Sequence, residues 1–378
     1  MKKGKKTQLF NHLSQRKPLL AAIAEVYALT FLQHETKEMY ASLTHDEHVA
    51  KMDIREERKN VVRTALYLVP APPPYRTVTL SHESNLNLTP SFPSLPQVLR
   101  AVCSLKSYAA QENVRITDMC RDKCGGQALV TENMLGQLSN CAVSLVVVEG
   151  DSCILAQKCV GELVKAALGN GSSVVKLARI AALSARVAVS NAVLLGIAFA
   201  GVDCSMHGKL LTLHYNTRLA ALARRLLVSS VKGRQGLDWS TKYTSEILEL
   251  HKVYAEMNAY NAISDKVEAM QSGEEKSFVT YWRDFFGLAV ICRRLDFYLE
   301  SVDAVTPSIA ASLRHAFDGA AIKCSHEVAL TAVAAFSIDT TTLNLPMAKL
   351  CAETKDTAEA RRLCECTPAA DFLAGLSR

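Results

Sequence analysis

The stretch LPQVLRAVCSLKSYAAQENVRITDMCRDKCGG, residues 95–126, carries the pattern that decides the fold class. Its apolar residues recur at steps of three and four, the spacing of one face of an α-helix: Leu99, Val102, Leu105, Tyr108 and Ala109. The glycine pair that closes the stretch can adopt the left-handed conformation that follows a last helical turn. The pattern therefore predicts a helix from Leu95 to about Lys123.

The flanking segments extend this helical pattern in both directions. A helical pattern runs from Gln8 to about Leu66, and the proline-rich residues 70–96 read as an irregular connector, because proline lacks a donor and disfavours helix in the residue before it. After the stretch, a short helix is expected around Glu132 to Leu138. The valine-rich run from Cys141 to Val148 is expected to be a buried extended approach to the next helix.

That next helix is predicted to begin near Asp151 or Ser152, either of which is a good N-cap, and to run to Leu168. The rest of the chain, from about Val174 to Leu376, is predicted to be mostly helical, with turns at 169–172, 233–236 and 273. We interpret the fold as all-α, with two helical bundles in series. The first would span residues 1–170 and the second residues 171–378.

The composition bears on three questions: nucleic-acid binding, membrane insertion and the state of the cysteines. Hydrophobic residues make up 49% of the 378 and the formal charge is +6, but beyond the lysine-rich start the basic residues alternate with acidic ones. This argues against nucleic-acid binding, which usually needs a denser basic stripe. The apolar run Val187 to Val202 is too short for a membrane span, so we expect a buried core helix there. The start of the chain does not read as a signal peptide, and the twelve cysteines are therefore expected to be free thiols in a reducing compartment.

One carboxylate stands out chemically. Glu149 follows Leu145 and a run of valines and precedes Gly150. A carboxylate in a partly apolar cleft has a raised pKa, which suits a general base. Taken singly, Glu149 can equally be a solvated turn residue, and the pair Gly125 and Gly126 can be only a helix C-cap.

Two motifs together resemble the acyl-CoA oxidases, relatives of the acyl-CoA dehydrogenases. The helix that contains Ala101–Lys106 leads to a Cys-Arg-x-x-Cys-Gly-Gly motif, matched by Cys120–Gly126, and a Glu-Gly-Asp-Asn motif then follows, matched by Glu149–Ser152. Residues 95–168 resemble the first C-terminal helical domain of that family. The stretch Gln8–Phe31 resembles a family helix as well, and the last third of the chain resembles the second helical domain more loosely.

The resemblance implies an FAD-dependent acyl-CoA oxidase of fatty acid β-oxidation, or its C-terminal half, that converts acyl-CoA and O2 to trans-2-enoyl-CoA and H2O2. Glu149 would be the base that removes the α-proton. The cofactor-contacting residues would be Gly125, Gly126, Gly150, Asp151, Ser152 and Gln157. The resemblance also implies an acyl-CoA substrate and a homodimer, or a partner that supplies the N-terminal helical and β-barrel domains, which have no counterpart in this chain.

Departures from the family pattern keep alternatives open. Gln127-Ala128-Leu129 replaces the usual His-Gly-Tyr, Val147-Val148 the usual Thr-Tyr, and Ser152 the usual Asn. A catalytically silent helical scaffold or dimerisation partner is therefore an alternative, and so are a truncated fragment and a dehydrogenase that passes electrons to a carrier protein.

Two further expectations concern metals and location. His45-Asp46-Glu47-His48 lies in a densely charged run that indicates a solvated helix face. Cys120 and Cys124 have no matched second pair at zinc-site spacing, and Cys364 and Cys366, even with Cys351, are too isolated and too near the C-terminus, so no metal is expected. The resemblance implies a peroxisome- or glycosome-like organelle, although the chain ends in Gly375-Leu376-Ser377-Arg378 rather than a Ser-Lys-Leu signal. The alternative location is the cytoplasm.

Overall fold

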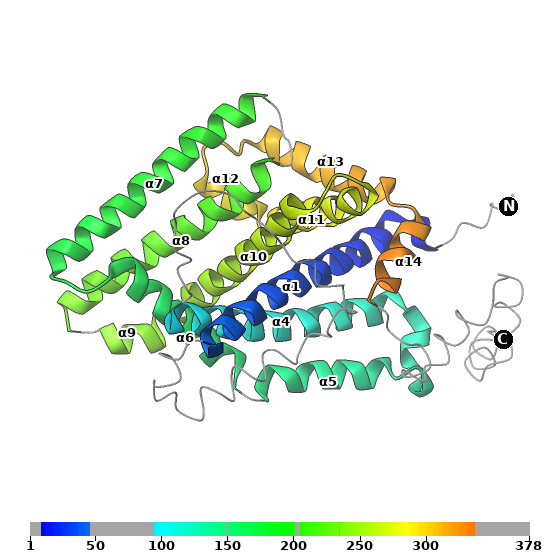
Figure 1. Cartoon of the computed structure of the whole chain (residues 1–378), viewed down its shortest axis with the longest axis horizontal. Coiled ribbons are helices and arrows are strands. Elements are labelled where there is room, and N and C mark those ends of the chain that lie inside the picture. Colours follow the sequence, from blue (N-terminus) through cyan, green and yellow to red (C-terminus); the bar gives the residue numbers. More distant parts are fainter. Residues whose placement is uncertain (1–8, 46–93, 149, 201–204, 234, 337–378) are drawn as a thin grey trace, which may run out of the picture.

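The computed structural model describes residues 9–45, 94–148, 150–200, 205–233 and 235–336, which form helices and contain no strand (Figure 1). The first part of the chain contains η1 (Leu9–Asn11), α1 (Leu13–His45), α4 (Leu95–Lys123), η2 (Gly125–Leu129), η3 (Thr131–Asn133), α5 (Leu135–Val147) and α6 (Ser152–Leu168). The second part contains α7 (Ser173–Ala200), α8 (Ser205–Val231), α9 (Gln235–Thr241), α10 (Thr244–Ala269), α11 (Glu274–Arg293), α12 (Leu295–Ser301), α13 (Pro307–Lys323) and α14 (His326–Ala334). The predicted all-α class is confirmed.

The bounds of α4 match the predicted ones, and local chemistry explains both. Ser94 caps the helix in a capping box, in which its backbone N–H donates to Oε1 of Gln97 at 2.7 Å, and Pro96 occupies the first turn. The helix ends at Lys123, after which Gly125 adopts a left-handed φ of 57°. The predicted helix from Ser152 to Leu168 is confirmed as α6, with Asp151 as its N-cap.

The main hydrophobic core joins both parts of the chain. Helix α1 packs against α4, α10 and α11 (Figure 1). Trp282 of α11 is fully buried and stacks on Tyr27 of α1, with ring centroids 5.7 Å apart. Because residues from α1 to α14 share one apolar cluster, the two parts of the chain stabilise each other. The division at residue 170 stays a prediction.

The expectation of an extended run at Cys141–Val148 is wrong, because α5 is a helix up to Val147. It lies along α4, with Ser139 and Ala142 buried and Val143 and Val147 exposed. Valine lowers helix propensity only slightly, so packing of the small residues against α4 outweighs it. The short helix expected around Glu132 to Leu138 is replaced by η3 and the first turn of α5.

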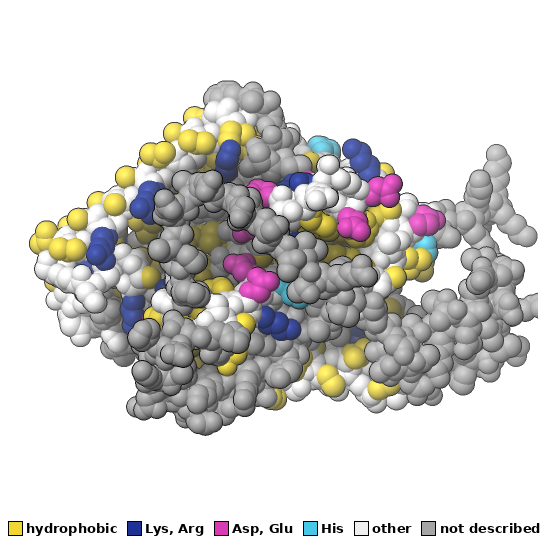
Figure 2. Space-filling view, in the orientation of Figure 1, with side chains coloured by type: hydrophobic (Ala, Val, Ile, Leu, Met, Phe, Trp, Pro, Cys, Tyr) yellow, Lys and Arg dark blue, Asp and Glu magenta, His cyan; other side chains and the backbone are white. Residues whose placement is uncertain are grey.

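The expectation of a buried core helix in the apolar run Val187–Val202 is also wrong. Helix α7 starts earlier, at Ser173, and lies at the edge of the molecule, where it packs chiefly on α8 (Figure 1). Apolar side chains line this edge in Figure 2, and they include the exposed Val174, Leu177, Val189 and Val193. Among the described residues, Ser173–Ile197 is the one single helix long and apolar enough to cross a membrane, with 11% of its apolar window buried.

Several predictions fall outside the described residues. The helical pattern from Gln8 is described from η1 and α1 up to His45, and its continuation to Leu66 lies outside. The same holds for the connector up to residue 93, for Glu149, and for the cysteines after residue 336.

Candidate active site

The predicted motif at 149–157 forms the junction between α5 and α6. Gly150 has a φ of 112°, which side chains of L-residues rarely allow. Asp151 then caps α6, and its Oδ1 accepts hydrogen bonds from the backbone N–H groups of Cys153 at 2.8 Å and Ile154 at 3.2 Å. The turn and the cap together fix the backbone on the C-terminal side of Glu149, whose own placement lies outside the described residues.

Helix α4 supports this junction through two buried polar side chains. Lys106 is 1% exposed, and its Nζ donates a short hydrogen bond to the carbonyl of Gly150. The hydroxyl of Ser107 donates to the carbonyl of Ser152 at 2.6 Å. These bonds hold the backbone on both sides of Asp151, so the position of the junction is set by α4 as well as by its own turn.

Ser152 has an internal role in this geometry. Its side chain is fully buried, and its Oγ donates to the carbonyl of Val146 at 3.0 Å, which ties α6 to the end of α5. Gln157 is half-buried on α6, and its amide forms no hydrogen bond within the described residues. Of the predicted cofactor-contacting side chains in this motif, Gln157 is therefore the one that makes no hydrogen bond within the described residues.

Gly125 and Gly126 lie at the opposite end of α4. The 17 steps from Lys106 to Lys123, at about 1.5 Å each, put this end about 25 Å from the junction. Both glycines are exposed, and a Cβ on Gly125 would meet no atom within 4 Å. One copy of the chain therefore does not bring the two predicted groups of residues together.

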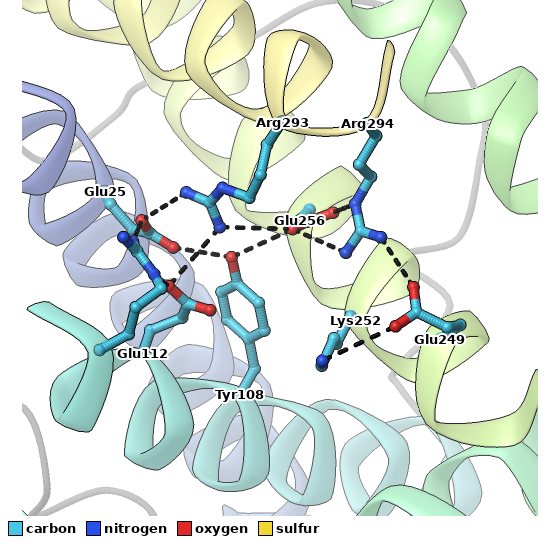
Figure 3. Close-up of polar contacts among 9 residues, drawn as sticks. Glu25, Tyr108, Glu112, Glu249, Lys252, Glu256, Arg293 and Arg294 are labelled. Atoms are coloured by element: carbon cyan, nitrogen blue, oxygen red, sulfur yellow. Dashed lines mark hydrogen bonds and ion pairs between the residues drawn. The ribbon is translucent and has the colours of Figure 1, made fainter. Parts of the chain in front are cut away.

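A network of charged side chains, with buried carboxyl groups at its centre, holds α4 in place (Figure 3). The hydroxyl of Tyr108 donates to Oε1 of Glu25 at 2.7 Å. Arg293 contacts Oε2 of the same carboxylate at 3.0 Å. Arg294 pairs with Glu256 at 2.7 Å. The network joins α1, α4, α10 and α11, and its members are Glu25, Tyr108, Glu112, Arg115, Glu249, Lys252, Glu256, Arg293 and Arg294.

The network perturbs its own carboxyl groups. Burial opposes the ionisation of Glu25, but Arg293 and Arg115 outweigh burial and lower the pKa of that carboxyl. Burial and the neighbouring Glu25 raise the pKa of Glu112 to about 7. Fully buried Tyr108 comes two positions after Lys106, about 200° around the helix, so the network holds α4 from the side opposite to the one that supports the junction.

Lys106, Ser107 and the charged network were not predicted from the sequence. A signal was present in each case: Glu25 interrupts an otherwise apolar stretch of α1, and the pair Arg293-Arg294 ends an apolar helix. Charged residues within an apolar pattern are almost never fully buried unless they are paired. The partners, however, lie as many as 268 positions apart in the chain.

Metal-ligand geometry is absent from the part of the chain that the structure describes. No group of three or more histidine, cysteine, aspartate or glutamate side chains gathers there. Cys120 and Cys124 are free, half-buried thiols, and burial raises the pKa of each. A raised pKa disfavours the thiolate that a metal binds.

Comparison with known proteins places this geometry in a family context. Residues 75–164 match the family model described as acyl-CoA oxidase, C-alpha1 domain. This range contains α4, η2, η3, α5, the junction and most of α6, and the resemblance stated from the sequence is confirmed. No curated protein sequence matches the chain.

Solved structures of acyl-CoA oxidases share the fold. Acyl-CoA oxidase 3 from Yarrowia lipolytica superposes with a TM-score of 0.66 at 15% identity, over 97% of this chain and 49% of the oxidase. Acyl-CoA oxidase-1 from Caenorhabditis elegans, solved with FAD and ATP, gives 0.64 at 12% identity, over 92% of this chain and 46% of the oxidase. Acyl-CoA oxidase 1 from Arabidopsis thaliana gives 0.55 at 16% identity, over 93% and 53%. The chain thus spans about half the length of the oxidases that it matches.

Proposed function

We propose, from the relationship of this chain to the acyl-CoA oxidases, that it supplies the catalytic base and part of the flavin-contacting surface of an acyl-CoA oxidase. The reaction would convert acyl-CoA and O2 to trans-2-enoyl-CoA and H2O2. The observation that supports the proposal most directly is the junction after Glu149, which matches the family in sequence and is held by buried groups of α4. Such preorganisation is what a positioned base requires.

The chemistry assigned to the chain is the removal of one proton. The carboxylate of Glu149 would take a proton from the α-carbon of the acyl thioester, and its backbone N–H would donate to the thioester carbonyl, where negative charge develops. Lys106 and Ser107 would act as positioning residues, because they fix the backbone of Gly150 and Ser152. Bound FAD would supply the second half of the chemistry, since it accepts a hydride from the β-carbon and passes the electrons to O2.

Several groups of the chain fit a flavin cofactor. Gly125 and Gly126 offer exposed backbone that a ligand can approach closely, and Gln157 offers a side-chain amide without a hydrogen bond in the described structure. Asp151 and Ser152 use their side chains internally, so we assign backbone contacts with FAD to them and to Gly150.

The separation of about 25 Å along α4 supports a dimeric arrangement. The glycine end of one copy and the junction of the same copy would contact two different flavins. In a homodimer each flavin would then receive Gly125 and Gly126 from one protomer and the junction from its partner. The related oxidases are about twice as long, and we propose that the remaining flavin and acyl-CoA contacts come from domains of the kind that the longer relatives contain.

The test is reconstitution. The 378-residue chain is purified alone and together with a chain that supplies the N-terminal helical and β-barrel domains of a related oxidase. Flavin absorbance and peroxide release with acyl-CoA are then measured. Both signals are expected when the domains are combined. Their absence under both conditions would reject the oxidase function for this chain.

The assignment of the base is tested by substitution. Glu149→Gln is expected to keep flavin absorbance and to abolish turnover, because the amide cannot accept the α-proton. Glu162→Gln is the matched control, since Glu162 lies on α6 and pairs with the exposed Lys165 at 2.7 Å. An unchanged rate in Glu149→Gln would remove Glu149 from the mechanism.

A catalytically silent scaffold is the second candidate function, and a specific observation favours it. Gln127-Ala128-Leu129 replaces the usual residues after the glycine pair. A scaffold would form the dimer without flavin absorbance, whereas the oxidase would show both. We also propose a peroxisome-like location by resemblance, which the distribution of a fluorescent fusion would test.

A further inference from the structure

A pocket of about 200 Å³ lies between α1, α4 and α10. Its polar lining includes Arg100 and Ser104 of α4 and Tyr254 and Asn258 of α10. Neither Lys106 nor Ser107 lines the pocket, although Ser104 precedes them on the same helix. The pocket therefore does not use the side chains that hold the junction.

Arg100 carries a charge that no carboxylate neutralises within the described structure. It forms no ion pair there, and its Nε is buried without a hydrogen-bond partner. The arginines of the charged network differ, because Arg115, Arg293 and Arg294 each contact at least one glutamate. Arg100 as a whole is half-buried, but its Nε is shielded from solvent, and a bound anion would offset the cost of leaving that group without a partner.

Further hydroxyl groups line the pocket with Arg100. The hydroxyl of Ser104 is buried, with the thiol of Cys159 as its polar neighbour and no nitrogen or oxygen partner within the described residues, and the residue is 2% exposed. The hydroxyl of Tyr254 interacts with Asn258 and Arg100, and burial raises the pKa of Tyr254, so this hydroxyl stays protonated at neutral pH. A guanidinium with nearby hydroxyl donors matches the planar geometry of a carboxylate.

The pocket also has an apolar lining and one acidic residue. Leu32 and Met39 of α1 and Ala101 of α4 supply the apolar lining. Glu35 also lines it, and burial together with Asp265 and Glu38 raises the pKa of that carboxyl. An anion is thus favoured on the Arg100 side and disfavoured beside Glu35.

We propose that this pocket binds a small organic carboxylate, with its carboxylate group on Arg100 and Ser104 and its apolar body against Leu32 and Met39. The proposal stands apart from the oxidase function, because neither a flavin nor acyl-CoA takes part in the binding. Ordered water could satisfy the same donors, so the experiment distinguishes water from an anion.

Binding is measured by calorimetry and by the shift in Tm of the full chain. The probes are hexanoate, its neutral amide hexanamide, and inorganic phosphate. Hexanoate is expected to bind and to raise Tm in proportion to the logarithm of its concentration, whereas hexanamide is not. Arg100→Gln is expected to weaken hexanoate binding by about tenfold or more, because a hydrogen bond to a charged group is lost. Arg186→Gln on the exposed surface of α7 is the matched control and should leave binding unchanged.

Two further variants keep the test decisive if Arg100→Gln does not fold. Ser104→Ala removes a hydroxyl whose polar neighbour is the thiol of Cys159, a weak hydrogen-bonding group, so it should fold about as well as the wild type and still bind hexanoate more weakly. Glu35→Gln should strengthen binding, because a nearby negative charge is removed. The proposal is overturned if hexanoate does not bind at millimolar concentration, if hexanamide binds equally well, or if phosphate alone binds. It is also overturned if Ser104→Ala and Arg100→Gln bind hexanoate like the wild type.

Discussion

The two halves of α4 differ in what they contact, although one continuous helix contains both. The first half, Leu95–Glu112, holds every buried residue of the helix, and its polar side chains bond to α1, α10, α11 and the junction before α6. The second half, Asn113–Lys123, is half-buried or exposed and leads to the exposed glycine pair. The first half is buried inside the chain. The second half also contacts other elements, since Arg115 pairs with Glu25 and Asp118 accepts a hydrogen bond from Ser139, but part of its surface and the glycine backbone that follows it are exposed.

This difference shows how one helix can serve two parts of a proposed site. Buried hydrogen bonds give the first half a single position, because leaving such groups unpaired is costly. Within the second half, the ion pair between Asp118 and Arg121 is exposed, with its charged atoms 3.8 Å apart. Exposed pairs of this kind contribute little to the free energy of unfolding. Substitutions in the first half should therefore change stability more than matched substitutions in the second half.

The largest expected effect is a pH dependence that comes from Glu112. Burial and Glu25 raise the pKa of Glu112 from 4.5 to about 7 in the folded protein. Between these two values the folded state binds a proton that the unfolded state releases. The stability contributed by this group is therefore present below about pH 4.5 and is lost as the pH rises through 7.

In the variant Glu112→Gln this dependence disappears. We therefore compare the free energies of unfolding of the wild type and the variant. The wild-type value minus the variant value is expected to fall by up to about 3 kcal/mol between pH 4.5 and pH 8. Urea unfolding of both proteins at these pH values measures the difference. An equal difference at both pH values would show that Glu112 ionises normally in the folded state.

The next largest effect on the free energy of unfolding is expected for one of the two lysines of α4. Lys106→Met removes a donor to the carbonyl of Gly150, and we expect a loss of about 2 kcal/mol in the free energy of unfolding. Lys123→Met, at the exposed end, should stay within about 0.5 kcal/mol of the wild type. Equal losses in the two variants would contradict the distinction between the halves.

A smaller effect is expected for two hydroxyls of the same helix. Ser107→Ala removes the 2.6 Å bond to the carbonyl of Ser152 and should cost about 1 kcal/mol. Thr117→Ala removes a half-buried contact to Asn113 at 3.4 Å, and its cost should be about half as large or less. Thermal unfolding of both variants gives the comparison, and a Thr117→Ala loss that exceeds the Ser107→Ala loss would reverse it.

The smallest effect concerns Gly125. Its left-handed φ of 57° makes Gly125→Ala unfavourable by about 1 kcal/mol, whereas Gly125→Asn should cost less, because asparagine tolerates this conformation. The space around Gly125 is open, so both variants should fold. If the alanine and asparagine variants are destabilised equally, crowding rather than backbone conformation explains why glycine is needed at position 125.

The sequence predicted the elements whose signals are local. The bounds of α4 were predicted from its apolar spacing and the glycine pair, and the start of α6 from the cap at Asp151 or Ser152; the structure adds the cap at Ser94. The all-α class follows from the three- and four-residue spacing of apolar residues. The resemblance to acyl-CoA oxidases also depended on short motifs, and the family model matches the segment that contains them.

Tertiary structure decided the conformation of α5, the exposure of α7, the burial of Lys106 and the pairing of Arg293 with Glu25. The valines of α5 suggest an extended segment, yet packing on α4 makes it a helix. The apolar residues of α7 suggest a core, yet the helix lies at an edge. The sequence predicts some features and not others because the interactions act over different distances along the chain. Caps and turns involve a few neighbouring residues, whereas burial and ion pairing depend on partners hundreds of positions away, such as Glu25 and Arg293.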